Sequence, residues 1–163
     1  MCTRAAAAAV AVLVPLFATV QPAAADPLPG GVFQMKTRAD YGGQCATIED
    51  RLVSRPCNKA NRAQQWTYNT EERVLRSKDP ALAGKCLTVV GPWLAMKECD
   101  PGPVFGDSAQ KFRVESGALY YGEGSSWVEP GRPGRRWIPV FPDGPNPTPE
   151  PDYSHKITFV PVS

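Results

Sequence analysis

Two segments of the chain repeat the same order of residues, and this repeat restricts the fold more than any other feature. Each segment runs through a cysteine, a stretch with β-branched residues, a second cysteine and a Gln-x-aromatic triplet. The two copies are Gln44-Cys45-Ala46-Thr47-Ile48, Cys57 and Gln64-Gln65-Trp66, and then Lys85-Cys86-Leu87-Thr88-Val89, Cys99 and Gln110-Lys111-Phe112. The first cysteines lie 41 residues apart and the second cysteines 42. Self-similarity at a period of about 20 to 50 residues indicates a fold assembled from repeated units.

A third copy of the unit follows, without its cysteines or its Gln. Ala118-Leu119-Tyr120 opens it as Val74-Leu75-Arg76 opens the second, and its last apolar run is Lys156-Ile157-Thr158-Phe159-Val160. Phe159 lies 47 residues after Phe112, close to the 46 that separate Trp66 from Phe112. We therefore expect three units: repeat one over 32–70, repeat two over 71–115 and repeat three over 116–163.

Each unit contains four short apolar runs separated by Gly, Pro, Asn and Asp, a pattern typical of all-β proteins. The predicted strands are Phe33–Arg38, Gln44–Glu49, Arg51–Cys57, Gln64–Asn69, Arg73–Lys78, Lys85–Val90, Trp93–Cys99, Lys111–Glu115, Ala118–Tyr121, Ser125–Glu129, Arg136–Val140 and Lys156–Val162. Pro and Gly together make up about a fifth of the chain, which favours turns over long helices. Three such units close most simply into a barrel with three-fold pseudosymmetry, because closure removes exposed sheet edges.

The N-terminus has the parts of a secretory signal peptide. A basic start over Met1–Arg4 precedes an apolar run over Ala5–Val20, and Ala23-Ala24-Ala25 offers small residues for cleavage. We expect a signal peptide over 1–25, cut after about Ala25, then a short lead over 26–31 and an exported protein. A membrane anchor is the alternative reading, but the apolar run falls short of the roughly 20 residues that cross a bilayer.

Four cysteines remain after the signal peptide, and an even number in an exported chain favours disulfides. Four cysteines permit three pairings, between which the sequence alone does not choose. The spacings of 12 and 13 residues favour two similar local bridges, Cys45–Cys57 and Cys86–Cys99. A metal site is disfavoured, because the chain has one His and lacks the C-x-x-C spacing of zinc sites.

The two Cys…Cys…Gln-x-aromatic copies resemble the ricin B-chain type of β-trefoil lectin. The resemblance covers residues 32–115 by motif and 116–163 by length and strand pattern. It implies an all-β fold, a β-trefoil barrel of three pseudo-symmetric four-stranded repeats, which binds carbohydrate and catalyses nothing. It also implies structural core roles for a set of repeat residues, namely Gln64, Trp66, Gln110, Phe112 and Phe159.

The sugar-contact positions of that family are not kept. The family places an Asp two residues after the first cysteine, and Thr47 and Thr88 stand there. It places an aromatic ring two residues before the second cysteine and an Asn before the Gln of Gln-x-Trp. The residues at those positions here are Arg55, Lys97, Ala63 and Ala109. We therefore expect any sugar site to use other residues.

Aromatic side chains beside a carboxylate suit a shallow sugar site, and basic side chains suit an anionic ligand. The second and third units supply both kinds of residue among Gly and Pro, and Trp127, Phe141 and Tyr153 lie in the same region. Either core packing or ligand contact fits these tryptophans. The tentative ligand-binding residues are Trp93, Glu129, Trp137, Arg132, Arg135 and Arg136.

Nothing in the sequence requires an enzyme. His155 is the only histidine, and we find no Gly-rich phosphate loop, no redox C-x-x-C and no run of metal ligands, so we expect no catalytic residues, cofactor or metal. With 18 Lys and Arg against 16 Asp and Glu, the net charge of +2 is too small for a dedicated nucleic-acid binder.

The sequence therefore predicts a secreted binding module whose partner is a carbohydrate or a protein. The alternative to sugar binding is a trefoil that has lost sugar recognition and binds protein. Such a trefoil would be a toxin accessory subunit resembling the lectin-like subunits of cytolethal distending toxins, or a hydrolase inhibitor. The Pro-rich loop over 141–154 is a stiff surface loop or a docking segment for such a partner.

Overall fold

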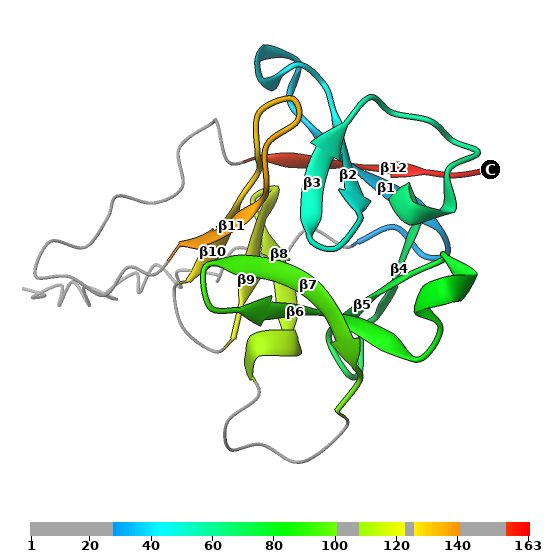
Figure 1. Cartoon of the computed structure of the whole chain (residues 1–163), viewed down its shortest axis with the longest axis vertical. Coiled ribbons are helices and arrows are strands. Elements are labelled where there is room, and N and C mark those ends of the chain that lie inside the picture. The colour runs from blue at the N-terminus through cyan, green and yellow to red at the C-terminus, as the bar shows by residue number, and fades with distance from the viewer. Residues whose placement is uncertain (1–27, 101–107, 123–125, 141–155) are drawn as a thin grey trace, which may run out of the picture.

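The computed structural model describes residues 28–100, 108–122, 126–140 and 156–163 (Figure 1). The predicted signal peptide, the Pro-rich segment 141–154 with Phe141 and Tyr153, and His155 lie outside the described residues. Within these ranges the chain forms twelve β-strands and four short 3-10 helices: β1 (Phe33–Thr37), η1 (Ala39–Tyr41), β2 (Cys45–Ile48), β3 (Leu52–Arg55), η2 (Arg62–Gln64), β4 (Trp66–Asn69), β5 (Val74–Ser77), η3 (Pro80–Leu82), β6 (Lys85–Val90), β7 (Trp93–Glu98), η4 (Ser108–Gln110), β8 (Phe112–Glu115), β9 (Ala118–Tyr121), β10 (Trp127–Glu129), β11 (Ile138–Val140) and β12 (Ile157–Pro161).

All strand pairs among the described residues are antiparallel. One sheet runs β3-β2-β1-β4-β5 with β12 beside β1, a second runs β11-β10-β9-β8, and β6 pairs with β7. Each of the twelve predicted strands overlaps one of these, which confirms the all-β fold class. None of the described helices is long and apolar enough to cross a membrane.

Two backbone hydrogen bonds at matching places connect the first of these sheets to the second. The amide of Phe112, at the start of β8, donates to the carbonyl of Arg73, just before β5 (2.7 Å). The amide of Ile157, at the start of β12, donates in the same way to Gly117, just before β9 (2.7 Å). Together with the strand pairs, these bonds give each of β1, β4, β5, β8, β9 and β12 two neighbours within this set of six strands.

The core is filled by one aromatic or aliphatic side chain from corresponding points of the three units. Trp66 pairs with Ser77, Phe112 with Tyr121, and Ile157 with Thr37, and the first member of each pair is buried. Ile157 therefore occupies the place that the sequence assigned to Phe159. Phe159 lies two residues further on, is half-buried and packs edge-on against Phe33, with ring centroids 5.6 Å apart.

The remaining strands form three hairpins, β2–β3, β6–β7 and β10–β11, whose second strands converge near the centre of Figure 1. Each hairpin places one large side chain in the core at this point, namely Leu52, Leu94 or Trp137, all fully buried. The Trp137 amide donates to the Leu52 carbonyl (2.9 Å), and Val53 forms an isolated antiparallel bridge with Arg136. The third hairpin is thereby attached to the first.

Both local disulfides predicted from the spacing are confirmed. Cys45 is bonded to Cys57 and Cys86 to Cys99, with 4.9 Å between the Cα atoms in each case. Each bridge closes one hairpin of the first or second unit, at the end away from its turn. In the chain-entropy account, closing a loop of this size stabilises the fold by about 3 kcal/mol.

Candidate functional site

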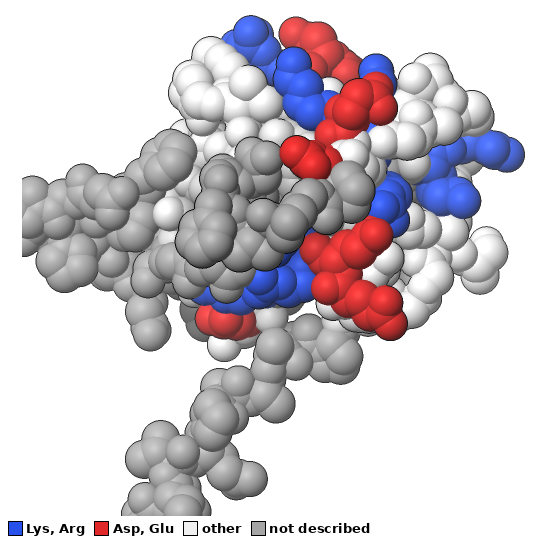
Figure 2. Space-filling view, turned by 90° about the horizontal axis from the view of Figure 1, so that it is seen from below, with Lys and Arg blue, Asp and Glu red and all other residues white. Residues whose placement is uncertain are grey.

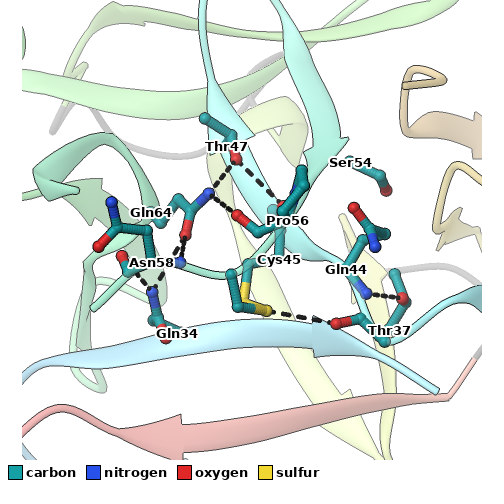
Figure 3. Close-up of a disulfide and its surroundings, with 12 residues drawn as sticks. Gln34, Thr37, Gln44, Cys45, Thr47, Ser54, Pro56, Asn58 and Gln64 are labelled. Atoms are coloured by element: carbon teal, nitrogen blue, oxygen red, sulfur yellow. Dashed lines mark hydrogen bonds between the residues drawn. A yellow bond between two sulfur atoms is a disulfide. The ribbon is translucent and has the colours of Figure 1, made fainter. Parts of the chain in front are cut away.

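The amide side chain of Gln64 ties together three parts of the first unit around its disulfide (Figure 3). Its Nε2 donates to Thr47 Oγ1 (2.9 Å) and to the Pro56 carbonyl (2.9 Å). Its Oε1 accepts from the Asn58 amide (2.7 Å) and from Gln34 Nε2 (3.2 Å). Because Gln64 is 1% exposed and its donors and acceptor are used, it has a structural role and is closed to a ligand.

Gln110 repeats this arrangement in the second unit. Its Nε2 donates to Thr88 Oγ1 (3.1 Å) and to the Glu98 carbonyl (2.9 Å), and its Oε1 accepts from the Asp100 amide (3.1 Å). In both units the amide joins the threonine after the first cysteine to the residues on either side of the second cysteine. The sequence repeat is thus reproduced as a repeat of hydrogen bonds.

These networks explain why the family's sugar positions are not available here. Thr47 and Thr88 are buried, and each hydroxyl donates to the carbonyl of its own unit's first cysteine while accepting from the Gln. Neither hydroxyl faces solvent. Of the other family positions, Ala63 packs against the core, Ala109 is half-buried, and Lys97 is exposed.

Arg55, at the family's aromatic position, is held by a carboxylate. Its Nε and Nη2 donate to the two oxygens of Glu49, at 2.7 and 2.9 Å. These hydrogen bonds hold the pKa of Glu49 below its usual value. Arg55 is therefore engaged in a bidentate ion pair and offers no apolar surface for a sugar ring.

A loop of the third unit, residues 130–137, is anchored on β3 through Ser54. The buried Ser54 hydroxyl donates to the Gly131 carbonyl and accepts from Trp137 Nε1 (2.9 Å). The Ser54 amide and carbonyl bond to Arg135 and Gly134 (2.9 Å each). Glycine is required at 131, because a Cβ there would lie 2.5 Å from two backbone oxygens. The backbone that carries Arg132, Arg135 and Arg136 is therefore held in place by these hydrogen bonds.

Three residues at matching places in the hairpins form a partly exposed cluster, which we call the axial cluster: Arg51, Trp93 and Arg136. Each directly precedes one of the buried residues Leu52, Leu94 and Trp137. The guanidinium carbon of Arg51 lies 4.1 Å from the centroid of the Trp93 ring, and that of Arg136 lies 4.6 Å from it. Guanidinium groups stack favourably on indole, so the three side chains hold one another in place.

Apolar residues flank the axial cluster on the same side of the hairpins. Val90 is directly opposite Trp93 in the β6–β7 ladder, and Ile138 is two residues after Arg136, so each shares a face with its neighbour. Among the described residues, the large hydrophobic side chains that are exposed belong to Val90, which is 37% exposed, and Ile138, which is 38% exposed. Together with the half-buried Trp93 they add apolar surface beside the two arginines.

The structure brings some of the predicted ligand-binding residues together and separates others. Trp93 and Arg136 meet in the axial cluster, and Glu129 is opposite Ile138 on the same face. Arg132 lies instead over the Tyr41 ring (5.7 Å), and the exposed Arg135 belongs to the same turn.

Trp137 does not fit the expectation of a ligand contact. It is fully buried, because it is the residue that the third hairpin places in the core, and its Nε1 donates a hydrogen bond to Ser54 Oγ. Trp127, 5% exposed, is buried as well. Arg51 was not among the predicted residues, and its position directly before a hairpin's buried residue, shared with Trp93 and Arg136, was the signal that could have found it.

Charged side chains of both signs are interspersed over the surface. Figure 2 shows Lys and Arg beside Asp and Glu on the face it presents, in keeping with the nearly balanced composition. The described residues contain no group of three His, Cys, Asp or Glu that would hold a metal ion.

Comparison with known proteins gives a structural likeness. The fold is similar to that of the C-half of the earthworm R-type lectin, crystallised in complex with GalNAc. The TM-score is 0.59 at 14% sequence identity, over 82% of this chain and 98% of that one. No family model and no curated protein matches the chain. The likeness shows that the chain has the fold of an R-type lectin unit.

Proposed function

We propose that this chain is a secreted, non-catalytic β-trefoil of the ricin type that binds carbohydrate at a non-standard site. The observation that carries the proposal is the likeness to an R-type lectin half over most of both chains. In the proposed arrangement, six strands form the barrel and three hairpins close one end, with repeats over 32–70, 71–115 and 116–163. The two continuous links between sheets and the repeated Gln networks support this arrangement.

Secretion is part of the same proposal. The basic and apolar segments of residues 1–25 form a signal peptide, and residues 26–31 are a short lead before the first repeat. Two disulfides support export, because such bonds persist in oxidising compartments and are rare in a reducing cytosol. The lectin-like fold supports a non-catalytic role.

We place the sugar site on the face that carries Trp93, Val90 and Ile138. The family positions are closed by Thr47 and Thr88, whose hydroxyls are already paired. Proteins bind a sugar ring by stacking its apolar face on an aromatic or aliphatic surface and by hydrogen-bonding its hydroxyls with polar side chains. Trp93 and its apolar neighbours offer the stacking surface. Glu129, on the same face as Ile138, offers a hydrogen-bond acceptor for the hydroxyls.

The test is binding of the mature chain, residues 26–163, to a multivalent glycan array and to insoluble polysaccharides. Multivalent display is needed because single sites of this size often bind with millimolar to micromolar constants. Trp93→Ala should abolish binding to the best glycan. Tyr120→Ala is the matched control, because Tyr120 also carries a stacked arginine, Arg113, 4.7 Å from its ring centroid.

Tryptophan fluorescence reports the same event. Trp66, Trp127 and Trp137 are at most 5% exposed, whereas Trp93 is half-buried, so a ligand-induced change should arise from Trp93. A blank array with folded protein would refute sugar binding and favour a protein partner, with the toxin-subunit and inhibitor readings tested by pull-down and by protease inhibition. Glycan binding unchanged in Trp93→Ala would refute the site alone.

A further inference from the structure

The axial cluster carries more positive charge than the described residues around it neutralise. Arg51 and Arg136 both lie over one indole ring, and Arg136 forms no ion pair with any described residue. Arg51 pairs with Asp50 at 3.8 Å, and the Asp50 side chain is 76% exposed. Glu129 is on the same face, opposite Ile138, two residues along the strand from Arg136. Two guanidinium groups therefore lie against the same ring, and among the described residues the long pair with Asp50 is the ion pair that they form.

Stacking leaves the guanidinium groups able to bind an anion. A guanidinium carries five N–H donors in its own plane, and an aromatic ring beneath that plane uses none of them. Arg51 and Arg136 flank the same ring, so their donors can converge on one anionic group at its edge. Such charge-assisted bonds to a sulfate or carboxylate are about twice as strong as those between neutral groups.

The cluster is also ordered before any ligand arrives. The backbone of Arg136 is bridged to Val53, and the adjacent residues bond to Leu52 and Ser54. Arg51 directly precedes β3, and Trp93 begins β7. A ligand that binds side chains already held in position loses less conformational entropy than one that must order them.

We propose that the axial cluster binds the anionic group of an acidic saccharide, a sulfated or carboxylated sugar, with Arg51 and Arg136 as the anion ligands. This inference rests on the proposed sugar-binding function and specifies its ligand class. The apolar surface of Val90, Trp93 and Ile138 distinguishes a saccharide from a free inorganic anion, because it provides a place for the sugar ring.

The test compares two polymers with the same sugar backbone, dextran sulfate and neutral dextran, against the mature chain by biolayer interferometry. We expect dextran sulfate to bind at least about tenfold more tightly, and Arg136→Gln or Arg51→Gln to remove about tenfold or more of that affinity. The matched control is Arg62→Gln, which neutralises an exposed arginine in η2 outside the axial cluster and should change binding less than about twofold. Polyvinyl sulfate, a sulfated polymer without sugars, should compete poorly.

Each failure has a distinct meaning. Equal binding of both dextrans, or equal losses in Arg136→Gln and Arg62→Gln, would overturn the anion site while leaving a sugar-binding protein. Competition by polyvinyl sulfate as strong as by dextran sulfate would overturn the saccharide assignment in favour of polyanion adsorption. No binding to either dextran or to any glycan of the array would refute the proposed function itself. Far-ultraviolet circular dichroism and a melting curve establish that each variant is folded.

Discussion

Replacing Gln64 by Leu tests whether the hydrogen-bond network of the first unit carries the stability assigned to it. Leucine has a similar volume but has neither donor nor acceptor, so the substitution removes the amide while keeping the buried position filled. Thr47 keeps an acceptor in the Cys45 carbonyl, and Gln34 keeps one in the Asn58 carbonyl. The Pro56 carbonyl and the Asn58 amide lose the partner that they have in the native protein.

The size of the effect follows from the number of bonds. Gln64 makes four side-chain hydrogen bonds, each with a net worth of about 1 kcal/mol. The greater apolarity of leucine offsets about 1 kcal/mol of this loss. We expect a decrease of about 3 kcal/mol in the free energy of unfolding, which is roughly a 10 °C decrease in Tm for a domain of this size.

Two further glutamines make the measurement interpretable. Gln110→Leu removes three such bonds and should cost about 2 kcal/mol. Gln65→Leu removes one exposed bond, to the Lys59 carbonyl, and should cost well under 1 kcal/mol. The assay is urea and thermal unfolding by circular dichroism with both disulfides intact. If Gln64→Leu were no more destabilising than Gln65→Leu, the structural account of the network would be wrong.

Three other perturbations have expected outcomes. Reducing both disulfides should lower the free energy of unfolding by about 3 kcal/mol per bridge without abolishing the fold, and an unchanged melting curve would contradict the bridges. Ser54→Ala leaves Trp137 Nε1 buried without its partner and should cost about 2 kcal/mol and alter the near-ultraviolet circular dichroism of the tryptophans, whereas an unaltered spectrum would argue against that contact. Arg55→Gln should raise the pKa of Glu49 towards its usual 4.5, as measured by NMR titration. The small stability gained from this exposed pair is present above pH 4.5 and is lost as the pH falls through the lowered folded-state pKa of Glu49. The native protein and Arg55→Gln should therefore have the same free energy of unfolding in acid.

The strands and disulfides of the first two units could be predicted because they depend on residues that lie close together in the sequence. The Cys45–Cys57 and Cys86–Cys99 spacings each span one hairpin, and each hairpin has two short apolar runs joined by a short turn. The burial of Trp66 and Phe112 follows from the same repeat. Where a motif fixes the register, short-range pattern and long-range packing give the same answer.

The third unit lacks that motif, and there the prediction was less accurate. Without a Gln or cysteines to fix the register, Phe159 matched the spacing of the large aromatic residues, while Ile157 is the residue that pairs with Thr37 and enters the core. The two residues share a strand face, so alternation alone does not distinguish them. Trp137 was open to either reading because its burial depends on Ser54, which lies 83 residues away in sequence.

The axial cluster shows why a candidate site in this fold is hard to find from sequence. Arg51, Trp93 and Arg136 differ in residue type and lie in three different units, so no motif connects them. They meet because each precedes the residue that its hairpin buries, and the three buried residues converge. Within a unit, by contrast, the polar positions nearest the disulfide are used by the Gln networks. A ligand that binds the axial cluster as proposed contacts residues from all three units, so its affinity should respond to substitutions in each of them.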